Sequence, residues 1–259
     1  MNRKIIRIRR QFKQSSVLFQ SENTKAINAA IEAVKFHREK LEKYILLHDE
    51  FLYSLKPVAV EENAPRIVKM MAEAGSLVNV GPMAAVAGSL ADLAVEAMLS
   101  SEAEVAIVED GGEVSASSKE AFIIGLYAGK NILSGSIGFK IQPSECPIGV
   151  ATSSATVSHV MSFSFGEADA ATVITDKASL ADASGVAICN AVRGEDEESS
   201  VQSGLDAAER IRDLIRGALI IRGKYAGTIG KIPQLVKISQ GIDIRQVTLL
   251  DISPDMILL

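Results

Sequence analysis

The order in which strand and helix patterns follow one another limits the fold of this chain more than any other feature of its sequence. Two strand-like stretches, residues 4–10 and 16–20, precede a long helical pattern at 23–47. Beyond it, strands and helices come in mixed runs, without the strict alternation of a doubly wound parallel sheet. The pattern therefore favours the α+β class. We expect mixed β-sheets packed with several helices in a single globular unit, one domain over 1–259 in which about 4–48 form the strand pair and long helix.

Apolar spacing and end signals define the individual elements. In the first helix, Ile27, Ile31 and Val34 are spaced by three or four residues, and Leu41 and Ile45 continue the stripe, so one face is expected to be buried. Further helices are predicted at 64–74, from Gly81-Pro82 to about 99, at 180–192 and at 201–215. Strands are predicted at 57–60, 105–108 and 170–175, within 121–153, and within 218–251, where turns are expected at Gly223, Gly227, Gly230 and Gly241.

Composition excludes several classes of protein. A hydrophobic content of 47% with 23% charged residues supplies a sizeable core and lacks the marks of disorder. The net charge of −5 argues against a nucleic-acid partner, and we interpret the basic residues of 1–13 as the charged outer face of a strand. The longest run of small apolar residues, 83–91, is about half a membrane span, so no membrane partner is expected.

Cys146 and Cys189 lie far apart in sequence and fit neither a disulfide framework nor a zinc site, which indicates a reducing, cytoplasmic location. A homodimer is expected by default, because it is the commonest arrangement of such chains. Dinucleotide-binding, P-loop and serine-hydrolase signatures are absent from the sequence. An oxygen-ligated magnesium site stays open, since carboxylates and hydroxyls are plentiful.

The stretch from Gly149 to 182 carries the clearest functional signal. After the glycine come small hydroxyl residues, Thr152, Ser153 and Ser154, at the end of a predicted strand. Such a turn gathers backbone N–H and hydroxyl donors in a small area, and polar or anionic ligands bind donor clusters of this kind. We expect these three residues to bind a ligand.

Three further residues are candidates with two interpretations each. His159 lies among apolar and hydroxyl residues, where it either transfers a proton as a catalytic group or is a buried histidine bonded to the backbone. Asp182, near the start of an apolar helix, either caps that helix or supports a cation that carries phosphates. Gly81 precedes a helix whose first N–H groups could face an anion or only water.

At these residues the sequence resembles the ApbE-like superfamily, whose best-known members are FAD-dependent protein FMN transferases. The resemblance is carried by Ala-Thr-Ser-Ser, then His159, the strand residue Thr172 and the Ala-Asp-Ala motif around Asp182. Upstream, residues 80–84 stand where the transferases have a Leu-Gly-Ala-Ile-Ala-Lys-Gly turn, and 111–113 stand where they have Gly-Gly-Asp. About residues 78–192 are covered, and the whole chain looks most like a short, uncharacterised archaeal and bacterial branch.

The resemblance implies an ApbE-like fold and a cleft, lined by residues 149–182, for FAD, FMN, a nucleotide or another phosphate-bearing ligand. It adds Gly81, Gly111, Gly112 and Thr172 to the ligand-binding residues and a magnesium ion at Asp182. Two departures weaken the metal site and argue against FMN transfer. Ala85 stands where the transferases have a lysine, and Val186 stands where they have a threonine that helps to hold magnesium.

Three functions therefore compete, and whether the protein is an enzyme stays open. The first is binding of a flavin, nucleotide or other phosphate-bearing ligand without clear FMN transferase activity. The second is implied by the resemblance to the archaeal branch: sulfide assimilation or sulfur transfer in homocysteine or cysteine synthesis. Cys146 would be the catalytic thiolate, and the alternative for this residue is a small buried side chain. The third is a non-catalytic interaction subunit whose ancestral site has decayed.

Overall fold

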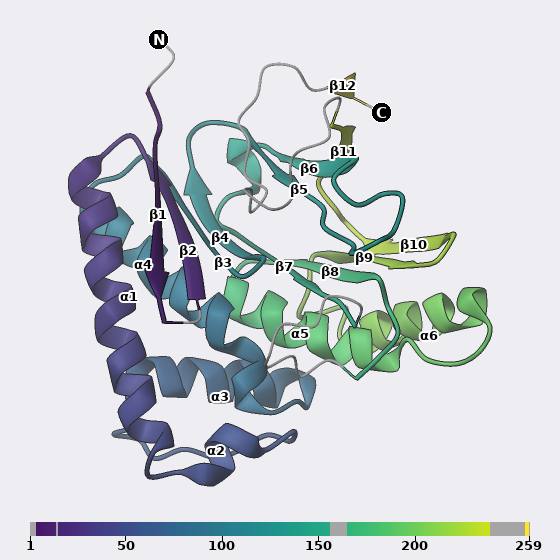
Figure 1. Cartoon of the computed structure of the whole chain (residues 1–259), viewed down its shortest axis with the longest axis horizontal. Coiled ribbons are helices and arrows are strands. Elements are labelled where there is room, and N and C mark those ends of the chain that lie inside the picture. The colour runs from purple at the N-terminus through teal and green to yellow at the C-terminus, as the bar shows by residue number, and fades with distance from the viewer. Residues whose placement is uncertain (1–3, 14, 156–164, 239–256, 259) are drawn as a thin grey trace. The chain divides into compact units, whose positions relative to one another are not determined.

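The computed structural model describes residues 4–13, 15–155, 165–238 and 257–258 (Figure 1). Contacts group the chain into two compact units, which are described separately. The first comprises residues 1–119, 147–151 and 176–184, and the second comprises 120–146, 152–175 and 185–259. Both units combine antiparallel strands with helices, which confirms the α+β class. That the whole chain forms one domain stays a prediction.

In the first unit an antiparallel sheet is built around the N-terminal strand pair. Its strands, in spatial order, are β1 (Ile6–Phe12), β2 (Ser15–Ser21), β3 (Val105–Asp110), β4 (Glu113–Ser118) and the first residues of β7 (Ile148–Ser153). The register places Phe19 of β2 opposite Val108 of β3, and Val108 opposite Ser115 of β4. The strand pair thus lies where the sequence indicated.

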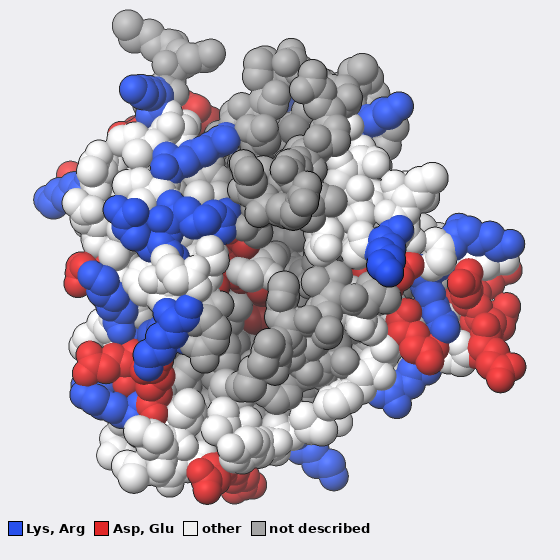
Figure 2. Space-filling view, viewed as in Figure 1, with Lys and Arg blue, Asp and Glu red and all other residues white. Residues whose placement is uncertain are grey.

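The edge strand β1 has the charged outer face expected of it. Ile6 and Ile8 pack against the core, whereas Arg7 between them is exposed. Lys and Arg side chains gather on the visible face over the position of β1 and α1 (Figure 2). Arg9 donates to the carbonyl oxygen of Ser16 at 3.2 Å, on the neighbouring strand. This alternation protects the edge from pairing with other strands.

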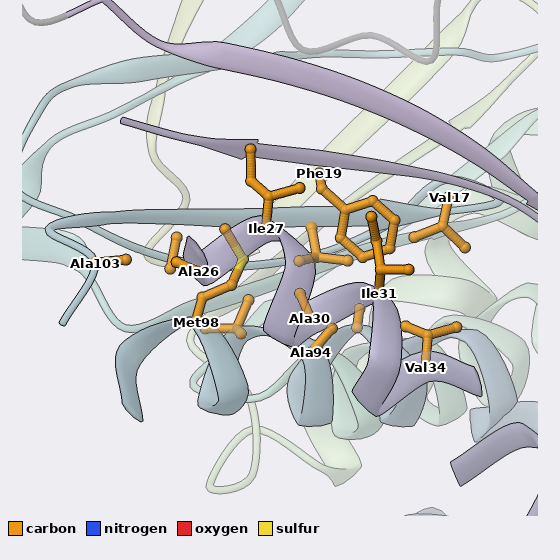
Figure 3. Packing of buried hydrophobic residues seen from close by; sticks show 14 of the residues in the cluster. Val17, Phe19, Ala26, Ile27, Ala30, Ile31, Val34, Ala94, Met98 and Ala103 are labelled. Carbon is orange, nitrogen blue, oxygen red and sulfur yellow. The ribbon is translucent and has the colours of Figure 1, made fainter. Parts of the chain in front are cut away.

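The helices of the first unit are α1 (Thr24–Ile45), α2 (Asp49–Tyr53), α3 (Arg66–Val78), the 3₁₀ turn η1 (Pro82–Ala85), α4 (Val86–Ser100) and the first residues of α5 (Ala178–Ala191). The predicted stripe of α1 is buried at Ile27, Ile31 and Val34, in a core that Phe19 of the sheet and Met98 of α4 complete (Figure 3). The side chain of Asn23 starts α1 by accepting the backbone N–H of Lys25 at 2.9 Å.

The segment Pro82–Ser100 is long and apolar enough to meet a criterion for membrane spans, and 61% of its most apolar 18-residue window is buried inside the protein. Ala91, Ala94 and Met98 of α4 belong to the core cluster that includes Ile27 of α1. The apolar character of this helix is therefore accounted for by packing.

In the second unit, one sheet has the order β12 (Ile257–Leu258), β11 (Gln234–Lys237), β6 (Ile137–Ile141) and β5 (Phe122–Gly125). The strands β8 (Ala170–Thr175), β9 (Gly217–Arg222) and β10 (Tyr225–Gly230) pair antiparallel in that order. Two helical segments, η2 (Pro143–Glu145) and α6 (Glu197–Arg210), follow β6 and α5. Val201 and Ala208 of α6 share a core cluster with Ile220 of β9.

Three predicted elements were wrong in type or bounds. Residues 57–60 form no strand, since they are half exposed and pair with no neighbouring strand of the described chain. Helix α6 starts at Glu197, not 201, because Asp196 accepts the N–H of Ser199 at 2.8 Å and caps it earlier. Gly227 lies inside β10, where a Cβ would come within 2.7 Å of Leu205 of α6, so packing and not a turn explains it. Gly241 lies outside the described residues.

Candidate functional site

Asp182 lies in the second turn of α5, within the first unit, and its carboxylate reaches the start of α4. Its Oδ2 atom accepts the backbone N–H of Gly88, the third residue of α4, at 3.0 Å. The N–H groups of Gly88 and Ala87 both act to lower the pKa of Asp182. The sequence allowed a cap on Asp182's own helix; the helix it caps is α4.

The start of α5 is capped in turn by Asp92, a buried residue of α4. Its two carboxylate oxygens accept the N–H groups of Ala178 at 2.9 Å and Ser179 at 3.0 Å. The hydroxyl of Ser115 also donates to Asp92, at 2.7 Å. Helices α4 and α5 therefore cap each other. A charged residue between Leu90-Ala91 and Leu93-Ala94 on a predicted helix was the signal in the sequence that could have identified Asp92.

Gly88 allows this mutual capping by letting the two helices approach closely. A Cβ at Gly88 would lie 2.3 Å from the carbonyl oxygen of Ala178. Gly149 serves the same junction from β7, since its Cβ would lie 2.2 Å from the backbone nitrogen of Ala178. Gly149, the first residue of the predicted ligand-binding stretch 149–182, therefore has a packing role.

Two further carboxyl groups interact electrostatically with Asp182. Burial raises the pKa of Asp182 to about 8, and Asp110 and Asp92 act in the same direction. Burial also raises the pKa of Glu113 well above its usual range, and Asp182 is the next largest cause. The pKa of Asp110 is raised to about 6 by burial, against the opposing effect of Arg38. We call Asp110, Glu113 and Asp182 the carboxyl cluster.

The turn between β3 and β4 brings two members of this cluster together. Gly111 and Gly112 have φ values of 73° and 116°, which suit glycine in a two-residue hairpin turn. Asp110 and Glu113 consequently face each other across the strand pair. The N–H of Gly112 donates to Glu109 at 2.9 Å. The predicted Gly111 and Gly112 thus lie beside Glu113, whose side chain, like that of Asp182, is partly exposed.

Gly81 lies just before η1, against a different part of the first unit. A Cβ there would lie 1.9 Å from the carbonyl oxygen of Ser54. The close approach that requires glycine is therefore to the chain's own backbone. The helix also begins with a 3₁₀ turn, which differs from the expected regular helix start.

The predicted hydroxyl residues lie in the second unit, at the end of β7. The hydroxyl oxygens of Thr152 and Thr172 are 2.9 Å apart across the strand pair, and Thr172 is fully buried. Thr152, Ser153 and Ser154 are half-buried. The structure thus brings Thr152 and Thr172 together, as neighbouring strand residues. His159 lies outside the described residues.

Cys146 follows η2 in the second unit and is half-buried. The adjoining turn is closed by a capping box in which the Glu145 carboxylate accepts the N–H of Gln142 at 2.8 Å. Arg216 donates to the carbonyl oxygen of Glu145 at 2.5 Å. The role of Cys146 in sulfur chemistry stays a prediction.

Among the described residues, no group of three or more His, Cys, Asp or Glu side chains is arranged to hold a metal ion. The carboxyl cluster is thus not a complete protein cage. Magnesium commonly uses one or two protein carboxylates and takes its other oxygens from water and phosphates. Glu113 and Asp182 fit that smaller requirement as hard oxygen donors, since both are partly exposed and lie in one unit.

Comparison with known proteins places the chain among sequences of a defined family. A family model described as "AbpE bacteria" matches residues 2–229. A UPF0280 protein of Methanocaldococcus jannaschii is 41% identical over 236 residues, which cover 90% of this chain and 94% of that protein. A UPF0280 protein of Methanopyrus kandleri is 40% identical over 230 residues, which cover 88% and 92%.

Solved structures give the same fold at much lower identity. The flavin transferase ApbE from Vibrio cholerae matches with a TM-score of 0.57 and 12% identity, covering 89% of this chain and 97% of that one. The apo form of the Pseudomonas stutzeri flavinyl transferase ApbE matches with a TM-score of 0.52 and 14% identity, covering 88% and 96%. At these identities the likeness concerns the fold alone, and it confirms the expected ApbE-like architecture.

Proposed function

We propose that this chain, which belongs to the AbpE bacteria family and is related to UPF0280 proteins, binds a flavin or another nucleotide. The protein would bind the phosphate groups of this ligand together with a divalent cation. The observation that carries the proposal is the position of Asp182, which is partly exposed and accepts the N–H of Gly88 at 3.0 Å, in the same unit as the partly exposed Glu113. The solved proteins of similar fold are named flavin transferases, which favours a flavin as the ligand.

The physical case for a cation rests on the charges of the cluster. Burial raises the pKa of both Glu113 and Asp182, and the charge of Asp182 adds to the effect on Glu113. Two events relieve the energetic penalty of these negative charges: one carboxyl group takes up a proton, or both carboxylates bind a cation. In the second case Glu113 and Asp182 would hold the cation, and the cation would supply positive charge to the phosphates. Asp182 would keep Oδ2 on the N–H of Gly88.

The hydroxyl residues of the second unit are the subject of a separate proposal, which does not depend on the cation site. We assign Thr152, Ser153 and Ser154 to contacts with a phosphate or a ring edge, and we keep the expectation that His159, which lies outside the described residues, contacts the ring. The pairing of Thr152 with Thr172 orients the Thr152 hydroxyl and makes Thr172 a supporting residue.

The proposal stops at ligand binding and does not extend to FMN transfer. Where the transferases have a lysine, this chain has Ala85, which is fully buried. Where they have a threonine that helps to hold magnesium, it has the apolar Val186. Neither side chain can donate or coordinate, so the groups that distinguish transfer from binding are missing at these positions.

Isothermal titration calorimetry with FAD, FMN and ADP, each with and without Mg²⁺, tests the proposal. We expect binding that requires Mg²⁺ and that weakens at least about tenfold in Glu113→Gln and in Asp182→Asn, since each variant removes one charged oxygen ligand. Glu104→Gln is the matched control, because Glu104 pairs with Lys119 at 3.1 Å outside the cluster. No binding of any of the three ligands, or equal binding by wild type and Glu113→Gln, contradicts the proposal.

A further inference from the structure

The second unit contains a cavity of about 280 Å³ that no residue of the proposed cation site lines. It lies where the end of α6 meets the start of β9 and the end of β10. Its lining residues are Ala208, Glu209, Arg212, Ile215, Arg216, Gly217, Ile229 and Gly230. All of them belong to the second unit, so the cavity is described within one compact body.

Two glycines form part of the cavity wall. Gly217 and Gly230 are paired across β9 and β10. A Cβ at Gly217 would lie 2.7 Å from the carbonyl oxygen of Ile229, and one at Gly230, whose φ is 68°, would lie 2.5 Å from that of Arg216. Backbone packing therefore requires glycine at both positions. As a consequence no side chain from either position fills the space.

The charged groups of the lining are two arginines and one glutamate, a net charge of +1 for these side chains. The backbone of Arg216 is held by two hydrogen bonds: its N–H donates to the carbonyl oxygen of Ile174 at 2.8 Å, and its carbonyl oxygen accepts from Lys231 at 2.7 Å. Its guanidinium donates to the carbonyl oxygen of Glu145 at 2.5 Å. The bond to Glu145 restricts the guanidinium before a ligand arrives, which lowers the entropic penalty of binding.

Arg212 is the more exposed of the two arginines, and it is positioned by Glu209. Their charged groups are 2.9 Å apart, one turn from each other along the chain. This pair is well exposed, so it contributes little to stability. Arg212, a residue with five N–H donors, lines the same cavity as Arg216.

The remaining lining side chains are apolar. Ile215 and Ile229 are half-buried, and Ala208 is fully buried. A ligand that meets both kinds of surface has an anionic end for the guanidinium groups and a compact apolar part for the isoleucines. Carboxylates and phosphates match the paired donors of arginine, because two parallel N–H···O bonds can form.

We propose that this cavity is a binding site for a small organic oxyanion, a phosphate ester or a carboxylate with a short apolar group. Arg212 and Arg216 bind the oxyanion, and Ile215 and Ile229 contact the apolar part. The site is separate from the carboxyl cluster, which has the opposite charge. Its ligand does not depend on Glu113 or Asp182.

Nuclear magnetic resonance titration of the ¹⁵N-labelled full chain tests this site with three probes: inorganic phosphate, phenyl phosphate and benzoate. The amide signals of Gly217 and Gly230 report directly on the cavity. We expect phenyl phosphate or benzoate to shift both signals at millimolar concentration, and to do so more strongly than inorganic phosphate, which lacks the apolar part. Whichever organic probe shifts them more identifies the anionic group.

Two variants separate the site from general attraction to positive charge. Arg212→Gln is expected to weaken binding of the organic probe by about tenfold or more, since it removes a charge-assisted donor. Arg210→Gln is the matched control, because Arg210 is exposed at the end of α6, two residues before Arg212, and does not line the cavity. The proposal is overturned if the signals of Gly217 and Gly230 do not move with either organic probe, or if both variants weaken binding equally.

Discussion

Asp92 and Asp182 cap each other's helices: Asp92 of α4 accepts two N–H groups at the start of α5, and Asp182 of α5 accepts the N–H of Gly88 near the start of α4. The two residues nevertheless differ. Asp92 is buried and binds three donors, whereas Asp182 is partly exposed and belongs to the carboxyl cluster. The first is a structural carboxylate, and the second combines a structural contact with the proposed cation site.

We therefore predict that Asp92→Ala lowers the free energy of unfolding by about 3 kcal/mol, because two backbone N–H groups and one buried hydroxyl lose their acceptor. Asp92→Asn keeps one carbonyl oxygen and should lose less. Urea denaturation followed by circular dichroism measures both. Asp206→Ala, at an exposed position of α6, serves as the control and should change the free energy by less than about 0.5 kcal/mol. Equal effects at positions 92 and 206 would show that the cap is energetically unimportant.

A pair of helix glycines tests the close approach of α4 and α5. Gly88→Ala should destabilise the protein by more than about 2 kcal/mol, since its Cβ would lie 2.3 Å from backbone atoms that cannot move independently. In Gly185→Ala the nearest atom is 3.4 Å away, so the higher helix propensity of alanine should leave stability unchanged or raise it by up to about 1 kcal/mol. Thermal unfolding of the two variants side by side decides; a tolerated Gly88→Ala contradicts the packing argument.

The carboxyl cluster predicts a pH dependence of stability in the presence of a metal chelator. Burial raises the pKa of Asp182 from 3.8 to about 8 and that of Asp110 from 3.8 to about 6. A carboxyl group with a raised pKa in the folded state stabilises the protein below its unfolded pKa, and this contribution is lost as the pH rises through the folded pKa. The contribution of the cluster should therefore fall steadily between pH 3.8 and about 8.

We would record the melting temperatures of wild type and Glu113→Gln between pH 3.8 and about 8. The difference between the two curves separates the contribution of the carboxyl cluster from that of the other carboxylates. The variant should show a smaller decline, because it removes Glu113, a carboxyl group whose own pKa is raised by burial and by Asp182. Mg²⁺ added at the alkaline end should raise the melting temperature of wild type more than that of the variant. Parallel curves for the two proteins would mean that the groups do not interact.

A double-mutant cycle measures the energy of the hydrogen bond between the hydroxyls of Thr152 and Thr172. Thr172→Val should destabilise by about 1 kcal/mol, and the change should be smaller when Thr152 is already valine, since the lost hydrogen bond is then shared. Flavin titration of the same variants separates the roles: Thr172→Val should leave affinity nearly unchanged if Thr172 only supports its neighbour. A larger loss of affinity with Thr172→Val than with Thr152→Val contradicts that assignment.

The sequence predicted best those features that a local pattern determines. The stripe Ile27, Ile31 and Val34 specifies both the helix and its buried face, and residues 170–175 form a strand with the bounds expected. The prediction of a strand at 57–60 was wrong because three apolar residues after a proline are too short a stretch to define a strand without a partner. Helix α6 starts before the predicted residue 201 because Glu197 and Glu198 occupy its first turn, where the helix dipole favours acidic side chains.

The candidate site depended on contacts between distant parts of the sequence. Nothing local to Asp182 shows that its partner is the N–H of Gly88, 94 residues earlier. In the same way, Gly81 and Gly149 looked like ligand-facing glycines, and only the neighbouring backbone at Ser54 and Ala178 shows what requires them to lack a side chain. Periodicity and motifs identify such residues, and the tertiary structure assigns their contacts.

The dependence of α4 on residues far along the chain also constrains biosynthesis. When a ribosome has released residues 1–119, the acceptors on Asp92 still lack their donors, since Ala178 and Ser179 have not been made. Completion of the first unit must wait until residues 120–146 and 152–175 of the second unit have been translated. A gene fragment ending at residue 119 would therefore encode a product with an unfinished interior, prone to recognition by chaperones and proteases, although it contains most of that unit's sequence.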